Sequence, residues 1–245
     1  MSRRITLATA ARVLRQLRRD PRTVVLILVV PCVLETLLKY VLDGVPGTFG
    51  RIGGPLLGLF PFITMFLVTS ITMLRERTTG TLERLMTMPV AKLDLLAGYG
   101  IAFGTVAAVQ ATLASAVAFG LLDLDVAGSK GAVLGLAVSN AILGTALGLF
   151  VSAFARTEFQ AVQFLPALVF PQLLLCGLFV PRDQMASLLQ AASDVMPLTY
   201  AYDSLERVTA QGSFDSTAAR DLAVVIGVTL LGLALGAATL RRRTG

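Results

Sequence analysis

The sequence contains no histidine and no tryptophan, and only 15% of its 245 residues are charged. Without histidine, the chain can build neither an HExxH zinc site nor a Ser-His-Asp triad or Cys-His dyad. Its two cysteines, Cys32 and Cys176, lie inside apolar runs, which predicts buried free thiols and not a disulfide framework. We therefore expect this chain to supply no catalytic residue and to bind no metal.

A nucleotide-binding loop is also missing from the sequence. The pattern G-x-x-x-x-G-K-[ST] occurs nowhere, and the AGSKG run that ends at Gly131 lacks its spacing. We expect the chain alone neither to bind nor to hydrolyse ATP by that route, and to hold no cofactor of its own.

What the sequence has in abundance is apolar residues, at 55% of the total, with a mean hydropathy of +0.77. Soluble domains carry about a quarter charged residues, so this composition predicts an integral membrane protein. Six runs reach the roughly 20 residues that cross a bilayer, and none shows the alternation of a strand. The predicted fold is one all-α transmembrane domain over residues 1–245, with spans at 23–42, 56–74, 95–122, 131–154, 160–180 and 222–240. The first run has no A-x-A site after it, so we expect a retained span and not a signal peptide.

The positions of lysine and arginine predict the orientation of these spans. Of the 21 such residues, 15 fall before the first span, in the second and fourth loops and after the last span. The other six fall in the loops of the opposite side. This split predicts that both termini lie in the cytoplasm.

Residues 1–22 predict an amphipathic helix that lies in the headgroup region of the membrane. At 100° per residue, Leu7, Ala10, Leu14 and Leu17 share one face, and Arg12, Arg15, Arg19 and Arg22 share the opposite one. Asp20-Pro21 would end this helix and turn the chain into the bilayer. The alternative is a simple positively charged anchor without two functional faces.

Polar residues inside the spans are costly and point to function by default. Glu35 stands four residues before Lys39, which favours an intrahelical pair, with a cargo or proton site as the alternative. Candidates for a substrate path are Gln110, Asn140, Gln163, Pro166 and Phe170. Hydrogen bonding between helices is an equally good explanation of the three amides. The 183–215 loop predicts one or two short helices on the outer side, because its apolar residues recur at helical spacing before Pro197.

Three stretches carry a family resemblance. RERTTGTLERLMTMP at 75–89 contains E-R-x-x-G-T-L-E-x-L-x-x-x-P, and residues 173–205 contain G-x-F-x-P followed by P-L-T-Y. LRRDPR at 17–22 is a third, shorter match. The chain resembles the ABC-2 type permeases, the membrane subunits of bacterial ABC exporters, and within them the daunorubicin-resistance type. It departs from the family at Met185-Ala186-Ser187, where a Pro-Gly-Trp-like turn is frequent.

The resemblance implies a partner and a mechanism. Two permeases would pair, as a homodimer or with a similar chain, and each would dock a separate ATPase subunit that binds ATP and magnesium. A coupling helix over 81–88 would rest in a groove of that ATPase. The docking residues implied are Glu76, Gly80, Thr81, Leu82, Glu83, Arg84, Leu85, Met86 and Pro89.

The residues of this stretch agree with a short docking helix. Gly80 can cap its beginning, Glu83 suits the first turn, and Pro89 blocks continuation. Leu82, Leu85 and Met86 would form the face that enters the ATPase. The expected cargo is a hydrophobic drug-like compound or a lipid, moved out of the cytoplasm or inner leaflet. The alternatives are export of a glycan or glycolipid and, outside transport, a six-span membrane enzyme or assembly factor. We expect no nucleic acid partner.

Overall fold

The computed structural model describes residues 2–45, 47–87 and 91–239, and these residues form helices and loops with no strand. Six helical segments are long and apolar enough to cross a membrane, as predicted. They are α2 (Pro21–Val41), α3 (Thr48–Thr78), α5 (Lys92–Gly120), α6 (Lys130–Val151), the compound helix Glu158–Leu175 and α11 (Ser216–Ala238). The chain is thus a multi-pass membrane protein.

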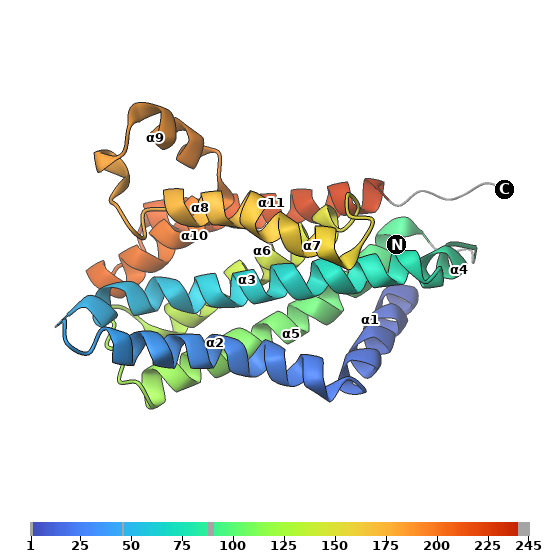
Figure 1. Ribbon diagram of the computed structural model, residues 1–245, viewed down its shortest axis with the longest axis horizontal. Coiled ribbons are helices and arrows are strands. Elements are labelled where there is room, and N and C mark those ends of the chain that lie inside the picture. The colour runs from blue at the N-terminus through green and yellow to red at the C-terminus, as the bar shows by residue number, and fades with distance from the viewer. Residues whose placement is uncertain (1, 46, 88–90, 240–245) are drawn as a thin grey trace.

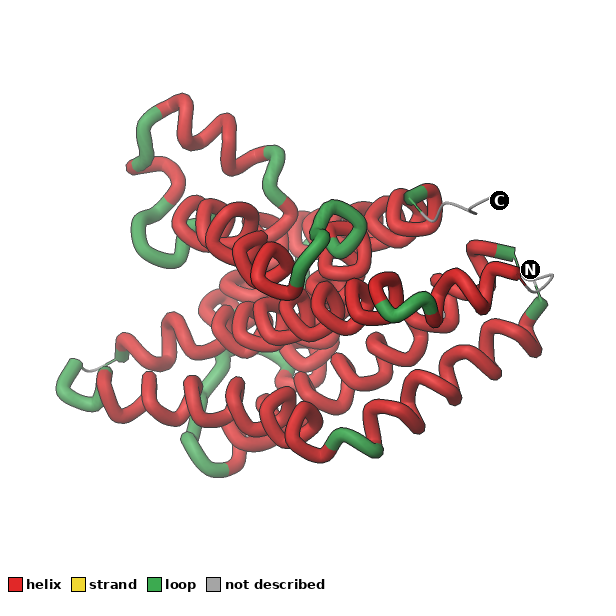
Figure 2. Tube along the Cα trace, turned by 45° about the vertical axis from the view of Figure 1, so that its right-hand side comes forward, coloured by secondary structure: helices red, strands yellow, loops and turns green. Residues whose placement is uncertain are grey.

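Short helices stand at both ends of this bundle. Helix α1 (Arg3–Arg18) and helix α4 (Thr81–Thr87) lie at one end, together with the last turns of α11 (Figure 1). Helices α9 (Ser187–Asp194) and α10 (Pro197–Glu206) lie at the other end. A 3₁₀ turn at Arg182–Gln184 leads into α9, and a π-helical turn at Arg207–Gln211 extends α10. Figure 2 shows that helices make up almost all of the described chain.

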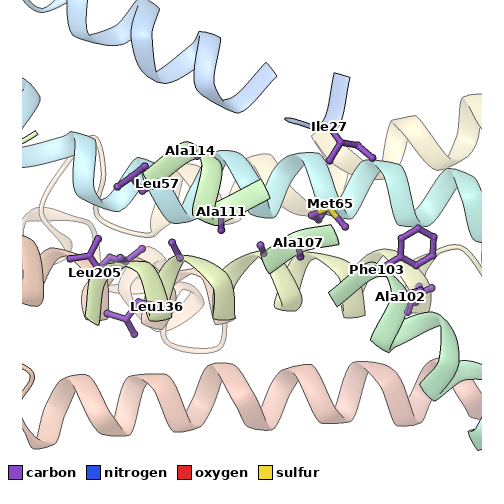
Figure 3. Packing of buried hydrophobic residues seen from close by; sticks show 14 of the residues in the cluster. Ile27, Leu57, Met65, Ala102, Phe103, Ala107, Ala111, Ala114, Leu136 and Leu205 are labelled. Atoms are coloured by element: carbon purple, nitrogen blue, oxygen red, sulfur yellow. The ribbon is translucent and has the colours of Figure 1, made fainter. Parts of the chain in front are cut away.

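Helices α3 and α6 form the centre of the bundle, and small residues let them approach closely. A Cβ added at Gly144 would lie 2.3 Å from the carbonyl oxygen of Phe62, and one at Gly148 would lie 2.5 Å from that of Phe66. Larger side chains at these two positions would force the helices apart. The surrounding core includes Ile27 of α2, Met65 of α3 and Phe103 of α5 (Figure 3).

The fifth span differs most from its predicted form. It consists of α7 (Glu158–Phe164), a π-helical turn at Leu165–Val169 and α8 (Phe170–Leu175), and it ends before the predicted residue 180. Proline lacks an amide hydrogen and clashes with the preceding turn, so Pro166 and Pro171 account for the widened turn. Gly177, with φ at +106°, turns the chain just after this helix. Apolar composition continues through residue 180, but the helix does not.

The 183–215 loop folds as the predicted short helices, held together by polar contacts. Arg182 forms ion pairs with Asp194 and, at 2.9 Å, with Asp203. The hydroxyl of Thr199 donates to the carbonyl of Ser193 at 2.9 Å, and that of Tyr200 donates to the carbonyl of Asp194 at 2.7 Å. The P-L-T-Y motif therefore ties the beginning of α10 to the end of α9.

Candidate functional site

The predicted coupling stretch forms a sharp turn and a short helix after α3. Gly80 adopts φ of +71°, a left-handed conformation that glycine accepts without strain. Its carbonyl accepts the first helical hydrogen bond of α4, from the amide of Arg84 at 3.0 Å. The glycine thus makes the turn that aims α4, and Thr81 begins the helix.

The two faces of α4 are not divided as predicted. Leu82 is only 3% exposed and belongs to the core of this chain, and Leu85 packs half-buried against the same core. Arg84 and Thr87 are exposed. Leu82 therefore anchors α4 to the rest of the bundle and has little surface left for a partner. Pro89 and the side chains of Glu83 and Met86 lie outside the described part of the chain.

Glu76, the first residue of the predicted motif, is buried at the junction of three helices. Its carboxylate lies 3.3 Å from a guanidinium nitrogen of Arg12, which comes from α1. The other terminal nitrogen of Arg12 donates to the hydroxyl of Tyr99 on α5. At the beginning of α1, the amide of Ser2 donates to Asp94 of α5 at 3.0 Å. These contacts fasten α1 to the bundle close to α4.

The side of α1 that packs on the bundle draws on both of its predicted faces. Arg12, from the arginine face, bonds Glu76 inside the bundle, and Leu7, from the apolar face, is 60% exposed. Thr6, Thr9, Ala10 and Val13 are the buried residues. The reason is that Glu76 and Tyr99 offer Arg12 partners inside the protein, which a helical projection of one segment cannot reveal.

We expect Arg12→Met to lower the stability of the protein, because it leaves the buried carboxylate of Glu76 without its cation. The expected loss is about 3 kcal/mol, and adding Glu76→Gln should restore part of it. Thermal unfolding of the purified protein measures both. Arg15→Met is the matched control, since Arg15 is exposed and, among the described residues, its guanidinium bonds only the carbonyl of Ala11. Equal melting temperatures for Arg12→Met and Arg15→Met would contradict this account.

A deep groove runs between α2 and α3 and has a volume of about 730 Å³. In Figure 1 the two helices diverge toward the end that carries α1 and α4. Its walls are largely apolar, with Leu26, Val30 and Leu34 from α2 facing Ile63, Leu67, Val68 and Ile71 from α3. The hydroxyl of Thr64 also lines it and bonds the carbonyl of Phe60 at 2.9 Å. This volume and lining suit a drug-sized apolar molecule.

The end of the groove nearest α4 is polar. Gln16, Asp20, Arg75 and Glu76 line it there. The side chain of Thr23 hydrogen-bonds Asp20, as does its backbone amide, and these bonds lower the pKa of the Asp20 carboxyl. Arg75 forms two hydrogen bonds with Glu158 of α7, at 2.6 and 2.9 Å. The groove thus joins an apolar interior to a charged rim beside the coupling stretch.

The predicted path residues do not gather at this groove. Gln110 is buried and donates to the carbonyl of Ile27 at 2.9 Å, and Asn140 is buried and donates to that of Ala201 at 3.4 Å. These are bonds between elements, the alternative that the sequence left open. Gln163, Pro166 and Phe170 are exposed on α7, the π-helical turn and α8. No sequence motif identifies the groove. The residues that line it from the α3 side recur every three or four positions from Phe60 to Thr79, as residues on one face of a helix do.

The predicted pair of Glu35 with Lys39 does not form. Glu35 is 1% exposed, and neither carboxylate oxygen has a hydrogen-bond partner among the described residues. Lys39 instead lies over the ring of Phe49, with its ammonium 5.0 Å from the ring centre. A cation over an aromatic face is a favourable contact, and here it takes the place of the predicted pair.

Comparison with known proteins decides the family. The family model described as ABC-2 type transporter matches residues 5–208. This chain belongs to that family. ABC-2 proteins supply the membrane-spanning part of ABC transporters, and the match covers α1, α4 and the first five spans.

Several named proteins have sequences distantly similar to this chain. The "Probable multidrug ABC transporter permease YbhR" of Escherichia coli is 26% identical over 153 residues, which are 62% of this chain and 42% of that protein. The E. coli "Inner membrane transport permease YhhJ" is 26% identical over 184 residues, 74% of this chain and 48% of that protein. "Linearmycin resistance permease protein LnrN" of Bacillus subtilis is 26% identical over 162 residues, which are 63% of this chain and 40% of that protein. The chain matches less than half the length of each.

Proposed function

We propose that this chain is the permease subunit of an ATP-driven exporter whose cargo is a hydrophobic drug-like compound or a lipid. The names of two relatives, a multidrug permease and a linearmycin resistance permease, support this class of cargo. The daunorubicin-resistance type remains our proposal for the subtype. ATP and magnesium would bind to a separate ATPase, and the permease would work as a pair with a second copy or a similar chain.

The groove between α2 and α3 is the observation that carries this proposal. Leu26, Val30 and Leu34 line it and are 61%, 37% and 39% exposed, so an apolar molecule has surface to cover there. The energy of binding would come mainly from removing the apolar area of the cargo from water or from the headgroup region. The charged rim beside Glu76 would bring the cargo close to the stretch that contacts the ATPase.

Helix α4 is our proposed contact with the ATPase. Arg84 and Thr87 are exposed on it, and Leu85 is half-buried. Glu76, which begins the motif, is bound to Arg12 of α1, so a movement of α4 would reach α1 and the groove rim together. ATP hydrolysis by the ATPase would change the position of α4 and thereby the width of the groove.

A reconstituted complex of the permease with its ATPase tests this function. We expect hydrophobic dyes such as ethidium to stimulate ATP hydrolysis, because an occupied groove changes the same helices that contact the ATPase. A soluble oligosaccharide should give no stimulation. Stimulation by the oligosaccharide alone would assign the protein to glycan export and reject the proposed cargo.

We expect both termini to lie in the cytoplasm, from the 15-to-6 split of lysine and arginine. A reporter fused after Gly245 should be active on the cytoplasmic side, and one inserted in the 183–215 loop on the opposite side. One described span, α11, separates the 183–215 loop from the C-terminal end, so reporters at these two positions should lie on opposite sides. Reporters that both report one side would contradict the proposed topology.

A further inference from the structure

A second, polar pocket lies at the end of the bundle opposite α4. It has a volume of about 250 Å³ and is lined by Arg51 of α3, by the Gly177–Asp183 segment, and by Tyr202, Asp203, Glu206 and Arg207 of α10 and its extension. In Figure 1 the beginning of α3 and helix α10 meet at the left-hand end. The pocket is too small for the expected cargo and far more polar than the groove.

Part of this pocket is a fixed frame. Arg182 is held by Asp203 at 2.9 Å and by Asp194, so its charge is already compensated. Gly177 lies against the ring of Tyr202, where an added Cβ would be 3.2 Å from a ring carbon. Arg207 lies 3.7 Å from Asp215. These contacts fix the walls and leave other groups to meet a ligand.

Several groups in the pocket have no partner among the described residues, among them Arg51, Tyr202, Glu206 and the Nε of Arg182. Arg51 and Glu206 form no ion pair there, either with each other or with another side chain. Tyr202 is 2% exposed, yet its hydroxyl makes no hydrogen bond within the described chain. Burial, and then the charge of Glu206, raise the pKa of Tyr202, so its hydroxyl keeps its proton as a donor. Glu206 is half-buried and Arg51 is exposed, so both present free charges to the pocket, and a bound molecule would give them and the Tyr202 hydroxyl partners.

We propose that this pocket binds a zwitterionic headgroup that carries a phosphate and an amine. The phosphate meets Arg51 and the Tyr202 hydroxyl, both donors, and the ammonium meets Glu206, an acceptor. Asp183 also lines the pocket and is exposed, and it adds a second negative charge for the amine. The volume accommodates such a headgroup without its acyl chains, which would lie along the adjoining apolar surface. The binding site is independent of the cargo groove and of ATP.

Binding to the full-length protein in phosphatidylglycerol nanodiscs tests this site, with four soluble probes. They are dihexanoyl phosphatidylethanolamine, glycerophosphoethanolamine, glycerophosphate and ethanolamine. We expect the two zwitterions to bind and to raise the melting temperature, and the anion and the amine alone to bind roughly tenfold or more weakly. Tighter binding of the dihexanoyl lipid would identify a membrane lipid as the source. Equal binding of both zwitterions would identify a free headgroup, and either result supports the site.

Variants separate the two halves of the pocket. Arg51→Gln and Glu206→Gln should each weaken zwitterion binding roughly tenfold, and Tyr202→Phe should weaken it less. Asp125→Asn, an exposed carboxylate outside the pocket, should change nothing. Melting temperatures without ligand show whether each variant is folded. If Arg51→Gln does not fold, Tyr202→Phe, which keeps the ring, tests the phosphate side of the pocket in its place. Failure of every probe to bind, or binding of glycerophosphate that Glu206→Gln leaves unchanged, would overturn the proposal.

Discussion

Leu85→Asp should abolish co-purification of the permease with its ATPase. Leu85 is half-buried on α4 and adjoins the exposed Arg84, so an aspartate there places a charge where an apolar contact is expected. A fully desolvated, unpaired charge in an interface costs several kcal/mol, which is enough to dissociate most complexes of moderate affinity. Pull-down of the ATPase by tagged permease from detergent-solubilised membranes measures the effect.

Two neighbouring substitutions give this experiment its controls. Leu82→Asp should lose the folded permease itself, because Leu82 is 3% exposed within the core of the chain. Arg84→Gln should leave a complex whose association is slower and more sensitive to salt, as expected for a charge at the rim of an interface. A folded Leu85→Asp permease that retains its ATPase would mean that α4 is not the docking element.

Thr64→Trp should abolish transport while the complex with the ATPase stays intact. Thr64 lines the groove from α3, and within the described chain its hydroxyl bonds only the carbonyl of Phe60, one turn earlier. Its replacement should therefore cost the fold little. The indole would occupy space that the cargo needs. We expect ATP-dependent ethidium uptake into inside-out vesicles to fall at least about tenfold, the effect of losing roughly 1.4 kcal/mol of cargo binding.

Thr105→Trp is the matched control for the groove. Thr105 is exposed on α5 outside the groove, and its hydroxyl bonds the carbonyl of Ile101 at 2.8 Å in the same way. It should transport normally. Equal loss of transport in both variants would show that a bulky side chain disturbs the bundle in general, and normal transport by both would remove the groove from the mechanism.

Much of this fold follows from the sequence, because the features that specify it are local. Runs of about 20 apolar residues mark the spans, and Gly80 followed by a short amphipathic stretch marks the turn and α4. The end of the fifth span was missed, because Gly177 ends the helix while apolar residues continue to Val180. Hydropathy predicts which residues lie in the membrane, but it does not predict the residue at which a helix ends.

The functional site was less predictable, because its parts come from different helices. Arg12 points into the bundle because its two partners, Glu76 and Tyr99, come from α3 and α5. Lys39 lies over the ring of Phe49 and forms no pair with Glu35. The groove is lined mainly by leucine, isoleucine, valine and threonine, which are common in any span. The substrate path was instead predicted from polar residues inside the spans, such as Gln110. Its side chain forms a hydrogen bond to a neighbouring helix.

Protection of a single thiol in the groove tests the central claim most directly. Thr64→Cys and Thr105→Cys would each be made in a protein whose Cys32 and Cys176 are replaced by alanine, and labelled with a membrane-permeant methanethiosulfonate. Ethidium at about ten times its dissociation constant should slow labelling of Thr64→Cys roughly tenfold, because occupied sites cannot react. Labelling of Thr105→Cys should not change. Equal labelling of Thr64→Cys with and without a dye that the complex transports would contradict the groove as the cargo site.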